Sequence, residues 1–416
     1  MLFPETAIVR QKLPRKEIKD IPAAVQRAFQ TLNLKARTKP GDSVAVGVGS
    51  RGISNISLIV KECLRLLKER DLSPFIVPAM GSHGGNTPEG EISTLAHLGI
   101  TESSMEVPIV AVDDVIQVGT LQTDVPILLA RAAAEADHVV VINRVKPHTK
   151  FHAAIESGPT KMLAVGLGKR QGAAVYHRAA IRYSFDILQD AARHILSASS
   201  VLFGLAIVED ACKNVARIAA MNPENWFETE QALLEEARLM MPRIPFDPID
   251  VLIVDEIGKD ISGIGMDSNV TGRHRDIAGD FFTAPHVKRI FVRELSPRSN
   301  GNANGIGLAD VTTQRLVDAI DFEKTYTNAL TAISPEKAAV PMHFQADRQC
   351  IEACLHTIGM IKPEAVRLVR IKNTATLDRL IVSKALEREV APNPDLEMVT
   401  PWRPMEFDEK GNLYSL

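Results

Sequence analysis

The chain has 416 residues, more than one hydrophobic core usually serves, so we expect two domains. An apolar fraction of 45% and a charged fraction of 24% are typical of folded proteins and argue against a disordered chain. The net charge of −3 argues against a broad basic surface, so nucleic acid is not an expected partner.

The four cysteines, at positions 63, 212, 350 and 354, show neither a disulfide framework nor a zinc-finger spacing. The amino terminus lacks a charged segment followed by an apolar one, and no apolar run approaches the roughly 18 residues of a membrane span. These features predict a cytoplasmic protein that has no membrane partner.

Strands and helices are expected to alternate from the start of the chain. An apolar run over 43–47 predicts a strand, and residues 54–69 have helical spacing. A second strand over 74–78 leads into a glycine-rich turn, after which Thr87 and Pro88 predict the start of a helix. This order is typical of a parallel sheet.

The alternation continues through the middle of the chain. A buried strand over 138–143 leads into a loop that contains His148. Further strands are expected at 201–208 and 251–254, with a charged helix over 224–241 between them. His148 therefore follows the carboxyl end of a strand, where open α/β sheets bind ligands.

A proline-rich segment, 242–248, resists regular structure and predicts a boundary between domains of residues 1–243 and 244–416. In the second domain we expect strands at 291–293, 366–371 and 380–382 and helices at 309–320 and 347–358. The predicted fold is α/β, with two lobes, mostly parallel sheets and an active-site cleft between the lobes.

The segment Gly47-Val-Gly-Ser-Arg-Gly52 has the spacing of a dinucleotide-binding turn, which an NAD-dependent dehydrogenase would use. The acidic residue expected about 20 positions on is absent from the strand that ends near Met80. The alternative is a tight turn whose glycines allow close backbone approach. Arg51 would then lie above a helix start, where a phosphate or carboxylate can bind.

The histidines at 148 and 152 and Glu156 are spaced so that one helix face could present all three to zinc. Pro147 and Lys150 disfavour a regular helix there. The simpler interpretation of His152 is a solvated or hydrogen-bonded side chain.

The segment Ser157-Gly-Pro-Thr-Lys161 predicts a helix start with Pro159 in its first turn. Free backbone amides and a lysine there would suit an anion such as a nucleotide phosphate. Lys161 could instead be a covalent attachment point if its amine is deprotonated by burial.

Several motifs occur together in a defined order. They are Arg51, Gly81-Ser-His83, Lys146-Pro-His148, Ser157-Gly-Pro-Thr-Lys161, His177 and Phe344-Gln-Ala-Asp-Arg348. In this order they resemble the nickel-pincer-dependent lactate racemase family of 2-hydroxyacid racemases and epimerases. The resemblance runs from about residue 40 to residue 360.

The resemblance implies a cofactor, the nickel-pincer nucleotide, which is a pyridinium-3-thioamide-5-thiocarboxylic acid mononucleotide that holds nickel. Lys161 would carry it through a thioamide and His177 would bind the nickel. His83 and His148 would be the paired acid/base groups. The implied reaction moves hydride reversibly between a 2-hydroxyacid and the cofactor, and the implied partners are this small molecule and the cofactor-maturation enzymes.

The resemblance also implies contacts to the substrate and to the nucleotide. Arg51 and Arg348 would orient the substrate carboxylate, while Ser157 and Gln345 would lie against the cofactor. Position 348 holds arginine where lactate racemase has lysine, and Phe344 stands where it has tyrosine. The sequence does not distinguish lactate, malate or a sugar acid, nor does it indicate the oligomeric state.

Two other functions stay open, an NAD-dependent dehydrogenase that uses the glycine motif and a non-catalytic protein that binds a nucleotide or metal. The glycine-rich segment 256–274 is a further candidate, because Asp267, Asn269 and Arg273 could contact a polyhydroxylated substrate. Its alternative is a self-packed surface loop. His152 also lies near the motif residues, although Lys-Pro-His favours His148 as the base.

Overall fold

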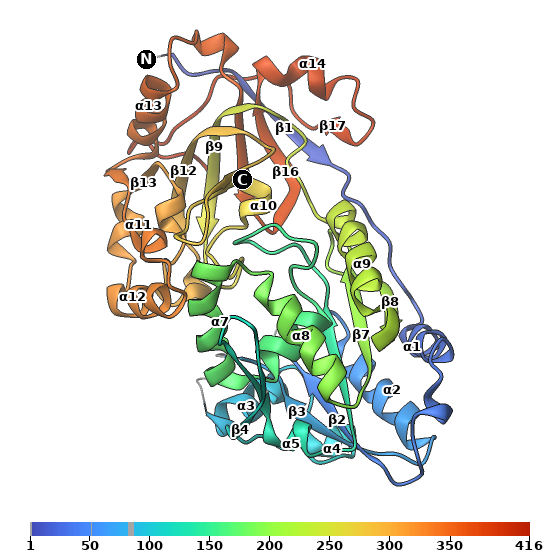
Figure 1. The fold of residues 1–416 in the computed structure, drawn as a ribbon. Helices are drawn as coiled ribbons and strands as arrows, with labels where there is room; N and C mark the ends of the chain where they lie inside the picture. Colours follow the sequence, from blue (N-terminus) through green and yellow to red (C-terminus); the bar gives the residue numbers. More distant parts are fainter. Residues whose placement is uncertain (1, 51, 82–86) are drawn as a thin grey trace. The chain divides into compact units, whose positions relative to one another are not determined.

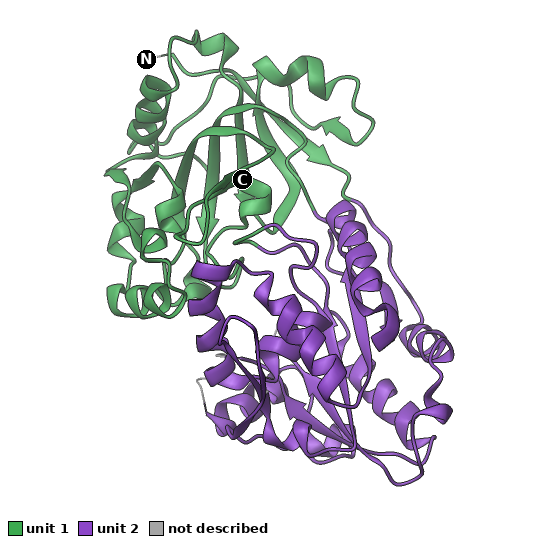
Figure 2. Cartoon of the chain, viewed as in Figure 1, with its two compact units in different colours: residues 1–13, 149–151, 242–416 green, residues 14–148, 152–241 purple. Residues whose placement is uncertain are grey.

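The computed structural model describes residues 2–50, 52–81 and 87–416. The expected site residues Arg51 and His83 therefore lie outside the described residues. The chain forms two compact units: unit 1 comprises residues 1–13, 149–151 and 242–416, and unit 2 comprises residues 14–148 and 152–241 (Figure 2).

The division differs from the expected domains at the amino terminus. Residues 1–13 group with the carboxyl-terminal residues rather than with a domain over 1–243. The reason is that β1 (Thr6–Gln11) pairs antiparallel with both β16 (Thr376–Ser383) and β17 (Leu396–Met398). Strand pairing joins distant parts of a chain, which a linear reading of linkers does not detect.

Unit 2 is built on a sheet with the strand order β3-β2-β6-β7-β8. Its members are β2 (Ser43–Val48), β3 (Ser73–Pro78), β6 (His138–Arg144), β7 (Val201–Glu209) and β8 (Val215–Met221). The first four run parallel to their neighbours, and β8 is antiparallel to β7. The expected strands over 43–47, 74–78, 138–143 and 201–208 are thus confirmed.

Helices cover this sheet, and β4 (Val115–Thr120) pairs with β5 (Pro126–Ala130) beside it (Figure 1). The helices are α1 (Ile21–Gln30), α2 (Ile56–Lys68), α3 (Pro88–His97), α4 (Glu102–Met105), α5 (Arg131–Ala134), α6 (Pro159–Lys161), α7 (Lys169–Tyr183), α8 (Ile187–Ala198) and α9 (Trp226–Met240). The π-helix η3 (Met162–Gly166) joins α6 to α7. Thr87 caps α3 and Pro88 opens it, as expected.

Two hydrophobic cores lie on the two faces of the unit 2 sheet. Along β2, Val44 and Val46 belong to one core and Ala45 to the other. Along β6, Val140 belongs to the first and Val141 to the second. These strands are buried on both faces, which explains why they are continuous apolar runs in the sequence.

Unit 1 contains a sheet with the strand order β14-β13-β12-β9-β15-β16-β1-β17. Besides β1, β16 and β17, this sheet contains β9 (Ile249–Ile257), β12 (Val287–Leu295), β13 (Val311–Thr313), β14 (Met342–Phe344) and β15 (Leu368–Asn373). Strands β10 (Arg273–His274) and β11 (Phe281–Phe282) form a separate two-stranded sheet. Its helices are α10 (Ser268–Thr271), α11 (Gln314–Asp318), α12 (Phe322–Thr331), α13 (Asp347–Thr357) and α14 (Glu387–Val390).

The strands from β14 to β15 run parallel, so both main sheets are mostly parallel and the α/β fold class is confirmed. The expected helix over 309–320 is partly wrong. Its first half is strand β13. The residues of β13, Val311, Thr312 and Thr313, are all β-branched, which favours a strand. Thr313 then caps α11 by accepting a hydrogen bond from the backbone N–H of Leu316.

Within residues 2–50, 52–81 and 87–416, no helix combines the length and the apolar character that crossing a membrane requires.

Candidate functional site

The loop that follows β6 brings two of the expected site residues together. Nζ of Lys161 lies 2.9 Å from Nε2 of His148, at hydrogen-bonding distance. Both side chains are partly exposed. The His148 ring also lies near Phe185, with 6.2 Å between the ring centroids. The lysine amine and the histidine imidazole thus lie side by side where solvent reaches unit 2.

The loop is tied together by its own polar side chains. The Ser157 hydroxyl accepts a hydrogen bond from the backbone N–H of Lys146 (2.7 Å) and donates one to the carbonyl of that residue (2.5 Å). Oε2 of Glu156 accepts a hydrogen bond from the backbone N–H of His148 (2.7 Å), and Arg238 donates to Oε1 (2.6 Å). The backbone that carries His148 is therefore fixed on both sides.

The loop geometry excludes the zinc-binding helix that Pro147 and Lys150 already disfavoured. Residues 148–156 are not helical. The buried Glu156 carboxylate is occupied by backbone amides and by Arg238, while the His152 side chain is exposed and lies 3.6 Å from it. The part of the chain that the structure describes contains no group of three or more His, Cys, Asp or Glu side chains that could hold a metal ion.

A buried carboxyl group supports the turn before Lys161. The backbone N–H of Thr160 donates to both oxygens of Glu230 (3.3 and 3.2 Å), and its hydroxyl donates to Oε2. Trp226 donates its indole N–H to the same hydroxyl (2.9 Å). Burial raises the pKa of Glu230 to about 8, although the hydrogen bonds from Thr160 oppose this shift.

Sequence reasoning missed Glu230, although a signal for it exists. On α9 the buried residues are Trp226, Glu230, Leu233, Leu234 and Ala237, which follow the spacing of one helix face. A carboxylate on the apolar face of a charged helix indicates a buried partner. Here the partner is the Ser-Gly-Pro-Thr-Lys turn.

The glycines near the end of β2 lie beneath the π-helix. A Cβ atom at Gly49 would come within 2.8 Å of the Met162 methyl carbon, and one at Gly47 within 3.3 Å of Leu167. At Gly52 a Cβ atom would meet nothing within 4 Å. Close packing therefore accounts for the first two glycines of the motif without a dinucleotide.

Both flanks of the segment 82–86 are tied to residues that follow Lys161. On one side, the backbone N–H of Gly81 donates to the carbonyl of Gly166 (3.3 Å). On the other side, Glu91 of α3 forms a buried ion pair with Lys169 at the start of α7 (2.8 Å). Gly81 and Glu91, which lie on either side of this segment, are thus anchored at η3 and α7.

His177, the expected nickel ligand, lies in the middle of α7 and is partly exposed. Helix α7 packs against η3, the π-helix that begins directly after Lys161. π-helices are rare and often occur at functional sites. Neighbouring elements of unit 2 therefore carry Lys161, His148 and His177.

The expected residues Gln345 and Arg348 belong to unit 1 and are both exposed. The Arg348 guanidinium lies over the rings of Phe3 (5.4 Å) and Phe407 (5.7 Å), with Nε 3.6 Å from Glu352. Its planar group therefore stacks on aromatic side chains.

The segment 256–274 packs within unit 1. Arg273 is buried, where it pairs with Asp310 (2.6 Å) and donates to the carbonyls of Leu308, Val287 and Lys288. The side chain of Asp267 caps α10. Arg273 therefore stabilises the fold of unit 1 and is not placed to make the substrate contact that the sequence suggested.

Residues 149–151 are also held within unit 1, by a buried cluster around Asp276. Its carboxylate pairs with Lys150 (3.1 Å) and Lys337 (2.7 Å) and accepts a hydrogen bond from Ser334 (2.5 Å). Burial opposes ionisation, but Lys150 and the hydrogen bonds from Lys337 and Ser334 hold the pKa of Asp276 well below its usual range.

Fold and site together define an α/β protein whose site includes a lysine–histidine pair just beyond the carboxyl end of a parallel strand. Residues 5–185 match the family model of the lactate racemase N-terminal domain. The resemblance to the lactate racemase family is thereby confirmed over this part of the chain.

Two solved structures are similar to this chain at 16% identity. A protein from Thermotoga maritima, solved by a structural genomics consortium, matches with a TM-score of 0.54 over 88% of this chain and 99% of its own. The lactate racemase apoprotein from Thermoanaerobacterium thermosaccharolyticum matches with a TM-score of 0.44 over 60% of this chain and 66% of its own. No curated protein matches the sequence.

Proposed function

We propose that this protein is a 2-hydroxyacid racemase or epimerase that carries a nickel-pincer nucleotide on Lys161. The observation that supports this most directly is the 2.9 Å contact between Lys161 and His148. The amine that would hold the cofactor lies beside an imidazole that would act on the substrate. Such proximity is what an acid/base group needs, because proton transfer requires donor and acceptor within hydrogen-bonding reach.

The residues present fit this cofactor. Lys161 is partly exposed at the end of α6, so its amine can react with a bound nucleotide. His177 would supply one imidazole to the nickel, and the nucleotide itself would supply the other donors, so no cluster of protein ligands is needed. Nickel accepts nitrogen and sulfur donors in a planar array. When bound, the group would supply a hydride acceptor, which no protein side chain offers.

The chain's own residues would bind the substrate and move its hydroxyl proton. Each enantiomer presents its hydroxyl at a different position, so one base serves one enantiomer and two bases are needed. His148 would be one base and His83 the other. The contacts of Gly81 with Gly166 and of Glu91 with Lys169 support His83, because both join the flanks of its segment to residues that follow Lys161 in the chain.

Attachment of the cofactor would also change the surroundings of His148. A lysine nitrogen in a thioamide would carry no charge and keep one N–H group, so it would compete less strongly for Nε2 of His148 than an ammonium group does. The imidazole could then accept the proton of a substrate hydroxyl. Glu156 would keep the His148 backbone in place throughout, through its hydrogen bond to the N–H group.

Four further assignments belong to the same proposal. Arg51 and Arg348 would orient the substrate carboxylate, since arginine binds carboxylates through two parallel donors. Ser157 and Gln345 would lie against the nucleotide. Because the Ser157 hydroxyl bonds to the backbone of Lys146, its substitution would also loosen the loop that carries His148.

The test is to produce the protein together with cofactor-maturation enzymes and offer it lactate, malate and sugar acids. We expect nickel in the protein, a covalent mass increase, and inversion of one substrate with exchange of its α-deuterium. Lys161→Ala should remove the mass increase, whereas Lys61→Ala, at an exposed lysine of α2, should retain it. Active protein of unshifted mass would contradict the attachment, and reduction of NAD by a hydroxyacid would favour the dehydrogenase.

A further inference from the structure

Strand β8 forms an open edge of the unit 2 sheet. It pairs with β7 on one side, and none of the described strands pairs with its other side. The backbone N–H of Ile18 donates to the carbonyl of Val215 (2.8 Å) and so covers the start of that edge. An open edge presents backbone N–H and C=O groups that can pair with another strand.

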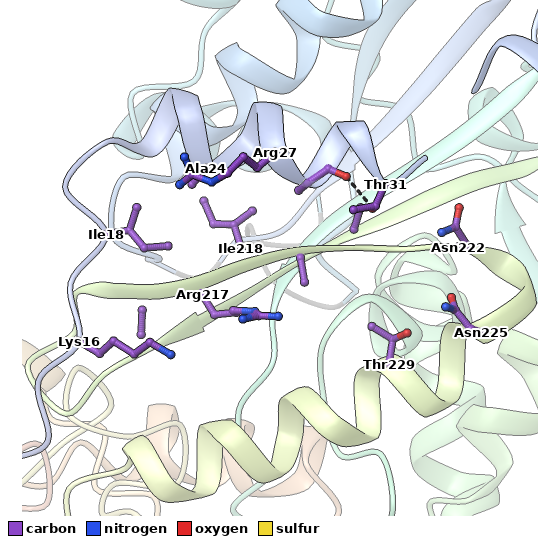
Figure 3. A pocket seen from close by; sticks show the side chains of 14 residues that line it. Lys16, Ile18, Ala24, Arg27, Thr31, Arg217, Ile218, Asn222, Asn225 and Thr229 are labelled. Atoms are coloured by element: carbon purple, nitrogen blue, oxygen red, sulfur yellow. Dashed lines mark hydrogen bonds between the residues drawn. The ribbon is translucent and has the colours of Figure 1, made fainter. Parts of the chain in front are cut away.

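A groove of about 630 Å³ runs along this edge. Helices α1 and α9 both pack against β8, which passes between them in Figure 3. The floor includes the small residues Ala216, Ala219 and Ala220 of β8, and Asn222, Asn225 and Thr229 line one end. Small side chains on the strand leave room for a second backbone. A strand of about six residues, roughly 20 Å long, matches the length of β8.

Positive charge lines the groove. Lys16, Arg27 and Arg217 all contribute to its lining and are exposed (Figure 3). Lys16 pairs with Glu236 (2.9 Å), whereas among the described residues no carboxylate lies within ion-pair distance of Arg27 or Arg217. The two guanidinium groups would repel the same edge of a second copy, and they would attract an acidic strand.

We propose that the groove beside β8 binds an extended acidic peptide segment of another protein by strand addition. The peptide backbone would pair with the free edge of β8. Adjacent residues of a strand point to opposite faces of a sheet, so one carboxylate would reach Arg27 on the α1 face and its neighbour would reach Arg217 on the α9 face. In such complexes the main-chain hydrogen bonds supply affinity, and the side chains on alternate positions supply specificity. This interaction is separate from the racemase site and does not depend on the proposed reaction.

The first experiment tests the charge complementarity. A fluorescein-labelled peptide of eight residues, in which pairs of valines alternate with pairs of glutamates, is titrated with the full chain, and the fluorescence anisotropy is measured. We expect saturable binding that the double variant Arg27→Glu and Arg217→Glu weakens by about tenfold or more. The matched control, Arg379→Glu and Arg403→Glu at exposed arginines of unit 1, should bind as the native chain does. Equal binding by both double variants would overturn the proposal.

The second experiment tests the backbone pairing. The same peptide with N-methyl groups on its two central residues keeps its charge and loses one backbone donor on each edge of the strand. We expect it to bind at least about tenfold more weakly than the parent peptide. Equal affinity would show ionic attraction without strand addition and would overturn the proposal. So would a native chain that dimerises through this edge, seen by light scattering as a dimer that Arg217→Glu alters.

Discussion

Nζ of Lys161 and Nε2 of His148 lie 2.9 Å apart, although 13 positions separate these residues in the chain. The contact depends on two supports, namely Glu156 under the His148 backbone and Glu230 under the turn that leads to Lys161. The candidate site is thus held by carboxyl groups that need not touch substrate or cofactor.

Under the proposed function, His148→Asn should abolish racemisation and leave the cofactor attached, because the imidazole would act on the substrate and would not hold the cofactor. Loss of an acid/base group costs about 10²- to 10⁴-fold in rate. His152→Asn is the matched control, since His152 is exposed and lies 3.6 Å from Glu156. Rates of α-deuterium exchange, with intact mass to check loading, measure both. Greater loss in the His152 variant would identify that histidine as the base instead.

Gly158→Ala should destabilise unit 2 and prevent cofactor attachment. Gly158 has a φ of +87° in the left-handed region, and a Cβ atom there would collide with Oε1 of Glu230. Gly41→Ala is the control, because Gly41 has a φ of +89° with nothing within 4 Å.

The control isolates the backbone cost of about 1 kcal/mol. The collision should add roughly 2 kcal/mol or more at Gly158. Urea denaturation measures both variants. Equal free energies of unfolding would show that Glu230 moves aside freely and does not define the turn.

Glu230→Gln should change how stability depends on pH. Burial raises the pKa of Glu230 from its ordinary 4.5 to about 8, so the folded state binds a proton that the unfolded state has lost between these values. The stabilisation is present in full below pH 4.5 and is lost as the pH rises through 8. Between these limits the native chain should lose about 1 kcal/mol per pH unit relative to the glutamine variant.

Thermal or urea unfolding at pH 5, 6, 7 and 8 would measure this difference. Glu228→Gln, at an exposed position on the same helix, should follow the native pH profile. Parallel profiles for the native chain and the Glu230 variant would mean that the carboxyl group titrates normally in the folded protein.

Asp276→Asn should destabilise unit 1, because it leaves the ammonium groups of Lys150 and Lys337 without their shared carboxylate. Breaking a buried ion pair from one side costs about 3 kcal/mol or more. Adding Lys337→Met should recover part of this loss by removing one uncompensated charge. Unfolding midpoints in urea report both changes, and a double variant less stable than the single one would exclude charge as the cause.

Much of the fold could be predicted because buried parallel strands are continuous apolar runs. Strands β2, β3, β6, β7 and β9 follow from such runs, and Thr87 with Pro88 marks the start of α3. The edge strands β8 and β17 were not expected. Residues on an edge alternate or carry charge, as Arg217 does in β8, so their local pattern resembles a loop.

The candidate site was likewise predicted only in part from the sequence. Turn chemistry singled out Lys161 and His148, because lysine and histidine in glycine- and proline-marked turns are the groups that react or bind metal near neutral pH, and the family resemblance added His177. Pairing across the sheet decided that the first 13 residues group with unit 1, and packing decided that Glu230 lies buried under Thr160. The local sequence determines which helices and strands are favoured and which reactive groups are present. Burial and contacts between distant residues arise only when these elements pack together.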